Sequence, residues 1–511
     1  MKQGIGSAVR TGTPATVAEF VIFRIARSAN AEAYRYPRAE GGWQSVTWSA
    51  AGEGIMRQAA GFVALGVDPG DRVAIMSGTR YEWVLADLAV MCAGGATTSV
   101  YPSALAVDVA YVLTDSQSHV VVAEDRGQAA KLRGVEGVRW VVLIDGEPAA
   151  DERDRVVSLA ELERRGTQLL AACPALVTDR IAAVRPENLA TLIYTSGTTG
   201  RPKGVRLSHS AWVYEANAIV ALDILHPDDV QFLWLPLSHS FAKVLVTAQL
   251  AVGFPTAVDG RVDKIVENMA EIHPTFMGAP PRILEKAHAR MVTTIAAEGR
   301  LTARLFAWAI DVGRKVSEIR LADRPIGPLL ATQHRIADAL VLSKIRDRFG
   351  GRIRFLLCGS APLDHELARW FHAVGILVLE GYGLTETAAG SCVNTPSALR
   401  FGTVGRPLPG TEAKVISDGE LLLRGPGVME GYHNRPEATA EALDAEGWMH
   451  TGDIGEIDTD GFVRITDRKK DLFKTSAGEY VAPSAIESHF MTLCPHAAQI
   501  VVHGAGRDYC T

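Results

Sequence analysis

The sequence predicts an α/β protein with a large N-terminal body of mostly parallel βαβ sheets plus a small β unit, followed by an incomplete small α+β C-terminal domain. Short β-rich runs alternate with amphipathic stretches of helical length through most of the chain, a pattern typical of βαβ units. Several of these runs are almost entirely apolar, as strands covered on both faces are. From residue 402 onward, short runs are divided by Gly, Pro and Asp turns, which favours an antiparallel unit.

Taken in order, the elements of the body follow from these patterns. The β-rich runs predict strands over 72–76, 119–123 and 140–144, and the stretch 81–92 predicts a helix. The segments with the apolar pattern of doubly covered strands are 141–143, 192–194 and 355–358. Because these strands are separated by helical stretches, they are expected to pair in parallel.

Residues 1–466 are expected to form the N-terminal domain. Within it, 281–349 have long helical periodicity and many charges and predict a helical insertion, and 402–466 predict the small β unit. Residues 467–511 begin with the charged stretch DRKKD and are expected to be a hinge and a truncated C-terminal domain. In this last part the sequence predicts a helix over 483–492 and a strand over 499–503.

The composition narrows the class of function. The 511 residues carry 52 Lys and Arg against 58 Asp and Glu, a net charge of -6, so the chain as a whole lacks the basic character of a nucleic-acid binder. The six cysteines form no CxxC pair, so neither a zinc knuckle nor a disulfide framework is indicated. No apolar run reaches the length of about 18 residues typical of a membrane span. We expect a cytoplasmic protein, for which peripheral membrane association and a homodimer stay open.

The most informative segment is TLIYTSGTTGRPKGV, at 191–205. An apolar strand leads into a loop of glycines and hydroxyls followed by Lys203, and such a loop can close its amides around a phosphate while the lysine adds a charge. A plain surface turn is the alternative interpretation. A Walker loop needs Gly directly before Lys, whereas Lys203 follows Pro202, which disfavours a P-loop NTPase. The sequence also lacks GxSxG, HExxH and GxGxxG motifs.

The string YTSGTTGRPKG at 194–204 resembles the signature loop of the adenylate-forming superfamily of acyl-CoA synthetases, luciferases and adenylation domains. Further motifs follow in the expected order: LPLSHSFAK at 235–243, GSAPL at 359–363, GYGLTET at 381–387, and HTGDIGEID with ITDRKKDLFK between 450 and 474. GAPPRILEK at 278–286 and KTSAGEYVAP at 474–483 are most similar to long-chain fatty acyl-CoA synthetases. The resemblance covers nearly the whole chain from about residue 17.

This resemblance implies a ligase that uses ATP, Mg²⁺ and coenzyme A to convert a long-chain fatty acid to acyl-AMP and then to acyl-CoA. Carried over by motif, the loop 196–200 with Lys203 binds the β- and γ-phosphates, and Tyr382 stacks on adenine. Asp453 and Arg468 hold the ribose, and Thr385 reaches the α-phosphate or the substrate carboxyl. The nucleotide-binding set is Thr195, Ser196, Gly197, Thr198, Thr199, Gly200, Lys203, Gly359, Ser360, Ala361, Glu380, Gly381, Tyr382, Gly383, Thr385, Asp453 and Arg468.

The remaining expectations concern the metal, the acyl group and the hinge. Thr198 and Glu386 are expected to hold Mg²⁺, which favours oxygen ligands. By resemblance, His239, Gly278 and Gly478 contact the acyl or pantetheine groups, and apolar side chains over 234–246 and 276–283 line an acyl tunnel. Lys470 is the expected hinge about which the last domain swings to bring in Lys474. The expected catalytic set is Lys203, Thr385, Glu386, Lys470 and Lys474.

Each assignment has a structural alternative: Glu386 as a helix-start carboxylate, His239 as a buried core histidine, Asp453 as part of a turn and the charges around Lys470 as a solvated linker. Members of the family continue beyond the position of Thr511 and carry there a lysine that contacts the reacting groups. That lysine segment is the reason why a catalytically impaired protein that only binds nucleotide or acyl chain stays open. A separate alternative is an acyl-AMP ligase that passes the acyl group to a carrier protein.

Overall fold

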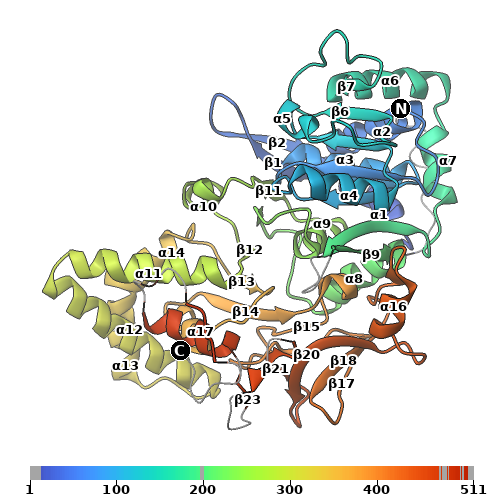
Figure 1. Ribbon diagram of the computed structural model, residues 1–511. Helices are drawn as coiled ribbons and strands as arrows, with labels where there is room; N and C mark the ends of the chain where they lie inside the picture. The colour runs from blue at the N-terminus through green and yellow to red at the C-terminus, as the bar shows by residue number, and fades with distance from the viewer. Residues whose placement is uncertain are drawn as a thin grey trace.

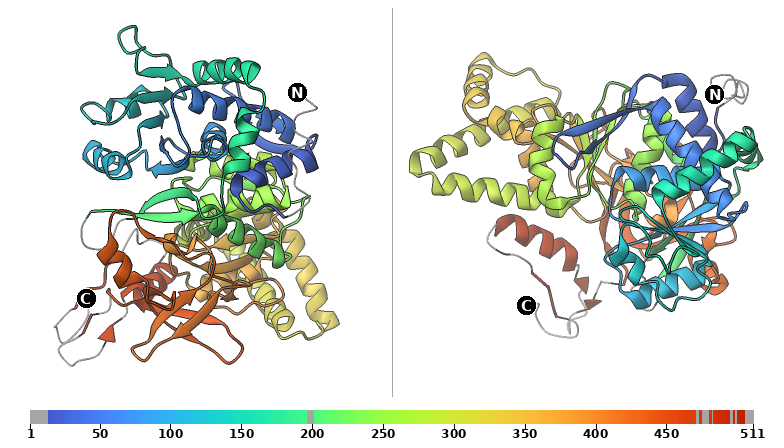
Figure 2. Two further views of the ribbon diagram at one scale, coloured as in Figure 1. Left: turned by 90° about the vertical axis from the view of Figure 1, so that its right-hand side faces the viewer. Right: turned by 90° about the horizontal axis from the view of Figure 1, so that it is seen from above.

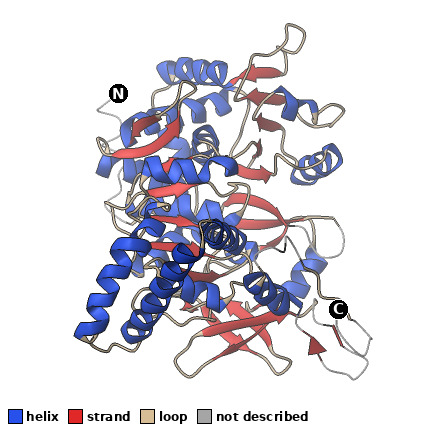
Figure 3. Cartoon of the chain, turned by 90° about the vertical axis from the view of Figure 1, so that its left-hand side faces the viewer, coloured by secondary structure: helices blue, strands red, loops and turns tan. Residues whose placement is uncertain are grey.

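Two large sheets form the body of the protein, and most of their neighbouring strands pair in parallel (Figure 1). The computed structural model describes residues 13–195, 201–470, 473–474, 480–481, 483–494, 497 and 500–504. Helices cover the strands on both faces (Figure 3). The prediction of an α/β fold with parallel-rich sheets and a small antiparallel unit is confirmed.

The first sheet has eight strands in the order β19-β9-β8-β4-β3-β5-β6-β7. Its parallel strands are β3 (Arg72–Met76), β4 (Ala96–Val100), β5 (Val120–Ala123), β6 (Trp140–Leu143), β7 (Val156–Ser158) and β8 (Leu189–Thr195). The antiparallel strands β9 (Lys203–Ser208) and β19 (Gly431–Tyr432) complete one edge. All four residues of β5 are buried, as the continuous apolar pattern predicts for a strand covered on both faces.

The second sheet has nine strands in the order β16-β15-β14-β13-β12-β10-β11-β1-β2. Its parallel strands are β1 (Glu32–Pro37), β10 (Gln231–Leu233), β11 (Thr256–Val258), β12 (Phe276–Gly278), β13 (Phe355–Cys358) and β14 (Leu377–Tyr382). At the two edges, β2 (Trp43–Thr47), β15 (Cys392–Val393) and β16 (Arg406–Pro407) pair antiparallel.

Helices follow the strands in βαβ fashion. The second sheet and one face of the first sheet share a large apolar core, and the other face of the first sheet packs in a separate, smaller core. The helices of the first half of the chain are α1 (Val17–Ser28), α2 (Trp48–Ala64), α3 (Tyr81–Cys92), α4 (Ala106–Ser116), α5 (Arg126–Ala130), α6 (Leu159–Ala172), α7 (Leu176–Ala183), α8 (His209–Ala221), α9 (Ser240–Val252), η1 (Val262–Lys264) and α10 (Ile265–Ile272). The short helices η3 (Thr385–Thr387) and α15 (His365–Ala373) flank β14 in the sequence. Among the described residues, no helix is long and apolar enough to cross a lipid bilayer.

A group of helices projects from the body between β12 and β13 (Figure 2). It consists of α11 (Pro281–Ala297), α12 (Arg300–Leu321), α13 (Pro328–Ala337), the π-helical η2 (Asp338–Leu342) and α14 (Ser343–Asp347). Helix α12 packs on α15 through Gly313, where an added Cβ would lie 2.3 Å from the Ala373 carbonyl oxygen. This close approach ties the projecting helices to the second sheet.

The small β unit is an antiparallel sheet of β17 (Glu412–Val415), β18 (Glu420–Arg424), β20 (Met449–Ile457) and β21 (Val463–Arg468), with α16 (Pro436–Ala442) beside it. Beyond it lie the pair β22 (Phe473–Lys474) and β23 (Tyr480–Val481) and helix α17 (Pro483–Leu493). The described residues 500–504 form no strand, so that part of the predicted strand over 499–503 is wrong. There the Val502 amide donates to the Glu487 carboxylate at 2.8 Å instead of pairing with a neighbouring strand.

Candidate active site

A cavity of about 1060 Å³ lies where the two large sheets meet the small β unit. Its walls come from the ends of β8, β13 and β14, from one face each of α8 and α9, and from β20 and β21. Because β13 and β14 are neighbouring parallel strands, their carboxyl ends open on the same edge, which is where ligands bind in such sheets. The fold thus gathers at one place segments that are far apart in the sequence.

The turns after β13 and β14 depend on glycine. A Cβ added to Gly359 would lie 3.1 Å from the Gly381 carbonyl oxygen, and one added to Gly383 would lie 1.9 Å from the Ala389 carbonyl oxygen. The backbone segments therefore touch directly, and Gly383 closes the turn after β14 onto the chain that follows it. Ser360, next to Gly359, adopts a φ of 70°, a left-handed conformation that non-glycine residues rarely take.

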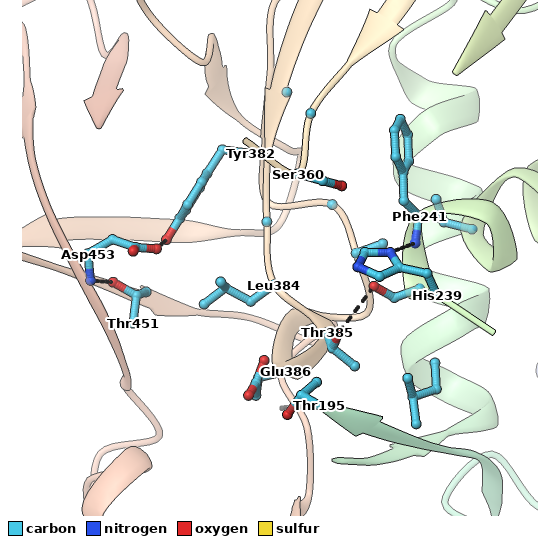
Figure 4. A pocket seen from close by; sticks show the side chains of 18 of the residues that line it. Thr195, His239, Phe241, Ser360, Tyr382, Leu384, Thr385, Glu386, Thr451 and Asp453 are labelled. Carbon is cyan, nitrogen blue, oxygen red and sulfur yellow. Dashed lines mark hydrogen bonds between the residues drawn. The ribbon is translucent and has the colours of Figure 1, made fainter. Parts of the chain in front are cut away.

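One polar group of the cavity is formed by residues of β14, β20 and β21, and Figure 4 shows its Tyr382 and Asp453 side chains. The Tyr382 hydroxyl donates to Asp453 Oδ2 at 2.5 Å, and Arg468 Nε lies 3.3 Å from Asp453 Oδ1. Asp453 and Arg468 face each other in the register of β20 and β21. Burial, together with the adjacent Asp453 carboxylate, raises the pKa of Tyr382 well above its ordinary value, so the phenol stays protonated and acts as a donor.

A second polar group links β9, β19 and the turn after β14. The Tyr432 hydroxyl donates to Glu386 Oε1 at 2.8 Å, and Lys203 Nζ lies 4.9 Å from the centre of the Tyr432 ring. Thr195 and Lys203 face each other across β8 and β9, and the lysine is the first residue of β9, at the end of the connection between these strands. Tyr432 thus contacts the carboxylate through its hydroxyl and the ammonium through its ring.

Helix α9 begins at the cavity, and His239 caps it. The Phe241 amide donates to His239 Nδ1 at 3.2 Å, which needs an unprotonated nitrogen at that position. Burial lowers the pKa of His239, consistent with a neutral ring. The hydroxyl of Ser240, the residue that follows His239, lies 3.4 Å from the Thr385 hydroxyl. In the view of Figure 4, Thr385 and Glu386 lie between the Asp453 group and His239.

The other part of the cavity wall is apolar. The residues that contribute to it are Ile219 of α8, Leu222 directly after that helix, Val244 and Leu245 of α9, and Leu357 of β13. The α9 contribution was expected from the sequence, whereas the α8 face and Tyr432 were missed. A sequence signal existed for α8, because Ile219 and Leu222 follow Glu215 at helical spacing on one face. None existed for Tyr432, which lies in no recognised motif.

Several predicted site residues lie elsewhere. Glu380 and Gly278 are buried outside the cavity wall, and Ala361 is exposed outside it. Burial raises the pKa of Glu380 to about 8, and the Gly278 carbonyl accepts a hydrogen bond from Trp234 Nε1 at 2.9 Å. The backbone of Lys474 belongs to β22. The predicted residues outside the described part of the chain are Ser196, Gly197, Thr198, Thr199, Gly200 and Gly478.

The predicted residues that do line the cavity come from several of its walls, but none comes from α8. They are Thr195, Lys203, His239, Gly359, Ser360, Gly381, Tyr382, Gly383, Thr385, Glu386, Asp453, Arg468 and Lys470. The fold therefore brings together residues whose numbers span nearly 280 positions of the sequence.

Comparison with known proteins gives matches over most of the chain. The profile of the family described as AMP-binding enzyme matches residues 23–433. A long-chain-fatty-acid–CoA ligase of Mycobacterium tuberculosis is 36% identical over 477 residues, which cover 92% of this chain and 77% of the ligase. Fatty acyl-CoA synthetase A of Dictyostelium discoideum is 35% identical over 468 residues, covering 86% of this chain and 67% of that protein.

Solved structures agree in fold. The crystal structure of the anthranilate CoA ligase AuaEII in complex with anthranoyl-AMP superposes with a TM-score of 0.74 at 20% identity, covering 97% of this chain and 84% of the ligase. A fatty acyl CoA synthetase of Mycobacterium tuberculosis superposes with a TM-score of 0.66 at 24% identity, covering 96% and 85% of the two chains.

Proposed function

Because the chain belongs to the AMP-binding enzyme family and is similar to long-chain-fatty-acid–CoA ligases, we propose that it joins a long-chain fatty acid to coenzyme A at the expense of ATP. In the first step a carboxylate oxygen of the acid bonds to the α-phosphorus of ATP, and pyrophosphate leaves. In the second step the CoA sulfur bonds to the acyl carbon, its proton is released, and AMP leaves with the bonding electrons.

The observation that carries this proposal is that one cavity has both a polar and an apolar wall. Asp453 and Arg468 suit a ribose, because a carboxylate accepts from two hydroxyls at once. Leu245 and Leu357 of the other wall suit an aliphatic chain. The volume of about 1060 Å³ exceeds that of most single-ligand pockets, which lie at roughly 300–1,000 Å³, and it suits two substrates held together.

These positions support the residue roles that we propose. Tyr382 offers its ring to the adenine base, Lys203 neutralises the leaving phosphates, and the Thr385 hydroxyl donates to the α-phosphate or to the acid. Both steps move concentrated negative charge, so positioning and charge neutralisation carry most of the catalysis. His239, which caps α9 beside Ser240 and Thr385, orients the carboxyl end of the acid.

The donor set at Glu386 fits a Mg²⁺ ion, which takes few protein oxygens and keeps several waters. Tyr432 donates to Oε1, and Oε2 has no hydrogen-bond partner among the residues that the structure describes, which leaves it to bind the ion. Thr198 is the second proposed ligand. When bound, the ion supplies neutralising charge at the phosphates.

For the second step we assign the CoA side of the reaction to the last segment. Lys470 lines the cavity and is the proposed hinge, and Lys474 and Gly478 form the proposed contact to the adenylate and the pantetheine arm.

Gly278 supports the acyl wall from behind, since a Cβ there would lie 2.5 Å from Leu235 and 3.3 Å from Phe241.

The test is pyrophosphate release from ATP and Mg²⁺ with saturated fatty acids of increasing chain length, with and without CoA. We expect release that depends on the fatty acid, and acyl-CoA when CoA is present. Acyl transfer to a phosphopantetheinylated carrier protein but not to CoA would make the chain an acyl-AMP ligase. Calorimetric binding of ATP without any pyrophosphate release would make it a nucleotide-binding protein and overturn the enzyme assignment.

We further propose that the projecting helices contact an anionic membrane surface. Residues 281–349 hold thirteen Lys or Arg and seven Asp or Glu, a net charge of +6 within a chain of net charge -6. On α12, Leu301 is 82% exposed and Leu305, one turn further, is 39% exposed. Exposed leucines beside basic residues suit the interface of an anionic lipid layer, where each basic residue contributes about 1 kcal/mol.

Co-sedimentation with vesicles tests this surface. We expect binding to phosphatidylcholine vesicles that contain phosphatidylglycerol, weaker binding to phosphatidylcholine alone, and loss of binding at high salt. Leu301→Ser with Leu305→Ser is expected to weaken binding severalfold, whereas the matched control Val262→Ser with Val266→Ser, two exposed valines outside these helices, is expected to bind as the parent does. Equal binding to both lipid compositions would contradict the proposal.

A further inference from the structure

Glu215 is a carboxyl group in the apolar wall of the cavity that the roles above leave without a function. It lies on α8, its side chain is fully buried, and it lines the cavity. Neither Oε1 nor Oε2 has a hydrogen-bond partner within the described part of the chain. A buried polar group without a partner is destabilising, because the hydrogen bonds that it gives up to water are not replaced, so such a group calls for an explanation.

The carboxyl of Glu215 is held between two backbone segments. A Cβ added to Gly390 would lie 2.7 Å from Glu215 Oε2, and one added to Gly427 would lie 2.9 Å from Oε1. Any larger residue at either position would collide with the carboxyl. The two glycines therefore leave room for this side chain at the wall, although the nearby Gly390 amide does not reach hydrogen-bonding geometry.

The surroundings make Glu215 a neutral acid. Burial raises the pKa of its carboxyl well above the ordinary value, and the Gly390 amide offsets this only in part. A neutral carboxylic acid has one O–H donor and a carbonyl acceptor. It can therefore give and take a hydrogen bond with a small uncharged group, whereas a carboxylate at the same place would repel the phosphates of ATP.

The position of Glu215 points to the acyl side of the cavity. Ile219, one turn further along α8, and Leu222, the C-cap residue of this helix, follow Glu215 at helical spacing and line the cavity too. The nucleotide side is marked instead by Tyr382, Asp453 and Arg468. A group that meets Glu215 therefore belongs to the hydrocarbon part of the substrate.

We propose that Glu215 is a hydrogen-bonding subsite for an oxygen substituent on the acyl chain, so that the cavity prefers hydroxy- or oxo-fatty acids to plain chains of equal length. This inference rests on the proposed function. A plain chain leaves both oxygens of Glu215 unpaired, while a hydroxyl at the right carbon pairs with them. Sites built to hydrogen-bond a substrate discriminate strongly against analogues that lack the partner group.

The experiment compares palmitate with hexadecanoic acids that carry a hydroxyl near the carboxyl, in mid-chain or at the terminal carbon. The readout is kcat/KM for pyrophosphate release by the full chain. We expect one positional isomer to exceed palmitate by about tenfold, the ratio that one satisfied buried hydrogen bond provides. The other isomers, whose hydroxyl falls on apolar wall, are expected to be poorer than palmitate.

Two variants separate the subsite from a structural role. Glu215→Met keeps the length of the side chain but removes its hydrogen-bonding groups, and it is expected to bring the ratio between the preferred isomer and palmitate close to one. Glu215→Gln keeps a donor and an acceptor and is expected to retain the preference. Thermal unfolding of each variant establishes that it is folded, and the wild-type isomer series tests the subsite even if a variant does not fold.

The outcomes are distinct. The subsite proposal is wrong if no isomer has a higher kcat/KM than palmitate in the wild type, or if Glu215→Met keeps the preference. The carboxyl then only fills the space between Gly390 and Gly427. If neither palmitate nor any hydroxy acid releases pyrophosphate, the proposed function itself fails.

Discussion

At the residue scale, the Asp453 carboxylate is the group whose loss should affect nucleotide binding most directly. Tyr382 and Arg468 hold it from two sides, so it is already oriented before a ribose arrives. We expect Asp453→Ala to raise the KM for ATP at least tenfold, because a hydrogen bond to a charged group contributes about 1.5–3 kcal/mol. The matched control is Asp460→Ala, an exposed carboxylate at the tip of the same β unit. Equal KM values for the two variants would contradict the assignment.

His209 makes a separate prediction about pH. The Val17 amide donates to His209 Nδ1 at 3.2 Å, and burial, with a smaller effect of Lys243, lowers the pKa of His209 from 6.5 to about 3. Between these two values the unfolded chain binds a proton that the folded chain does not, so this contribution to stability is lost as the pH falls. In urea titrations, His209→Gln is expected to reduce the pH slope of the unfolding free energy there by about one proton, or 1.4 kcal/mol per pH unit. An unchanged slope would show that His209 ionises normally in the fold.

At the scale of elements, a buried ion pair joins α9 to α3. Lys243 Nζ contacts Asp87 Oδ2, and their side chains are 1% and 0% exposed. We expect Lys243→Met to lower the free energy of unfolding by about 3–5 kcal/mol, because it leaves a charge buried without its partner. Lys243→Met combined with Asp87→Leu removes both charges and is expected to regain most of that loss. A double variant as unstable as the single one would show that packing, not charge, dominates here.

The same pair shows what a sequence motif can and cannot predict. LPLSHSFAK was recognised as one string, yet two of its residues have different surroundings: His239 lines the cavity and Lys243 lies in the core. Helical periodicity and apolar runs predicted elements such as the strand over 355–358, because local pattern decides their burial. The strand over 499–503 failed in its described part because a strand also needs a partner, which local pattern does not provide. Glu215 and Tyr432 became visible only when long-range contacts placed them at the cavity.

At the scale of the whole molecule, the cavity joins parts that are separate in sequence. Its walls belong to both large sheets and to the small β unit, so the nucleotide that we propose to bind there is expected to contact all three and to stabilise the folded chain as a whole. At an ATP concentration of one hundred times Kd, binding is expected to add about 2.7 kcal/mol to the free energy of unfolding. Scanning calorimetry should show Tm rising with ATP, and Asp453→Ala should show a much smaller rise. A Tm independent of ATP in the wild type would contradict nucleotide binding at this cavity.

The tight turn after β14 restricts how this protein can be re-engineered. With an added Cβ only 1.9 Å from the Ala389 carbonyl oxygen, Gly383 admits no other side chain without moving the backbone. A mutational library aimed at that turn would consist largely of misfolded clones. Diversity in substrate range has to be introduced on the helical walls instead, where residues such as Ile219 and Leu245 can change size without disturbing the turn.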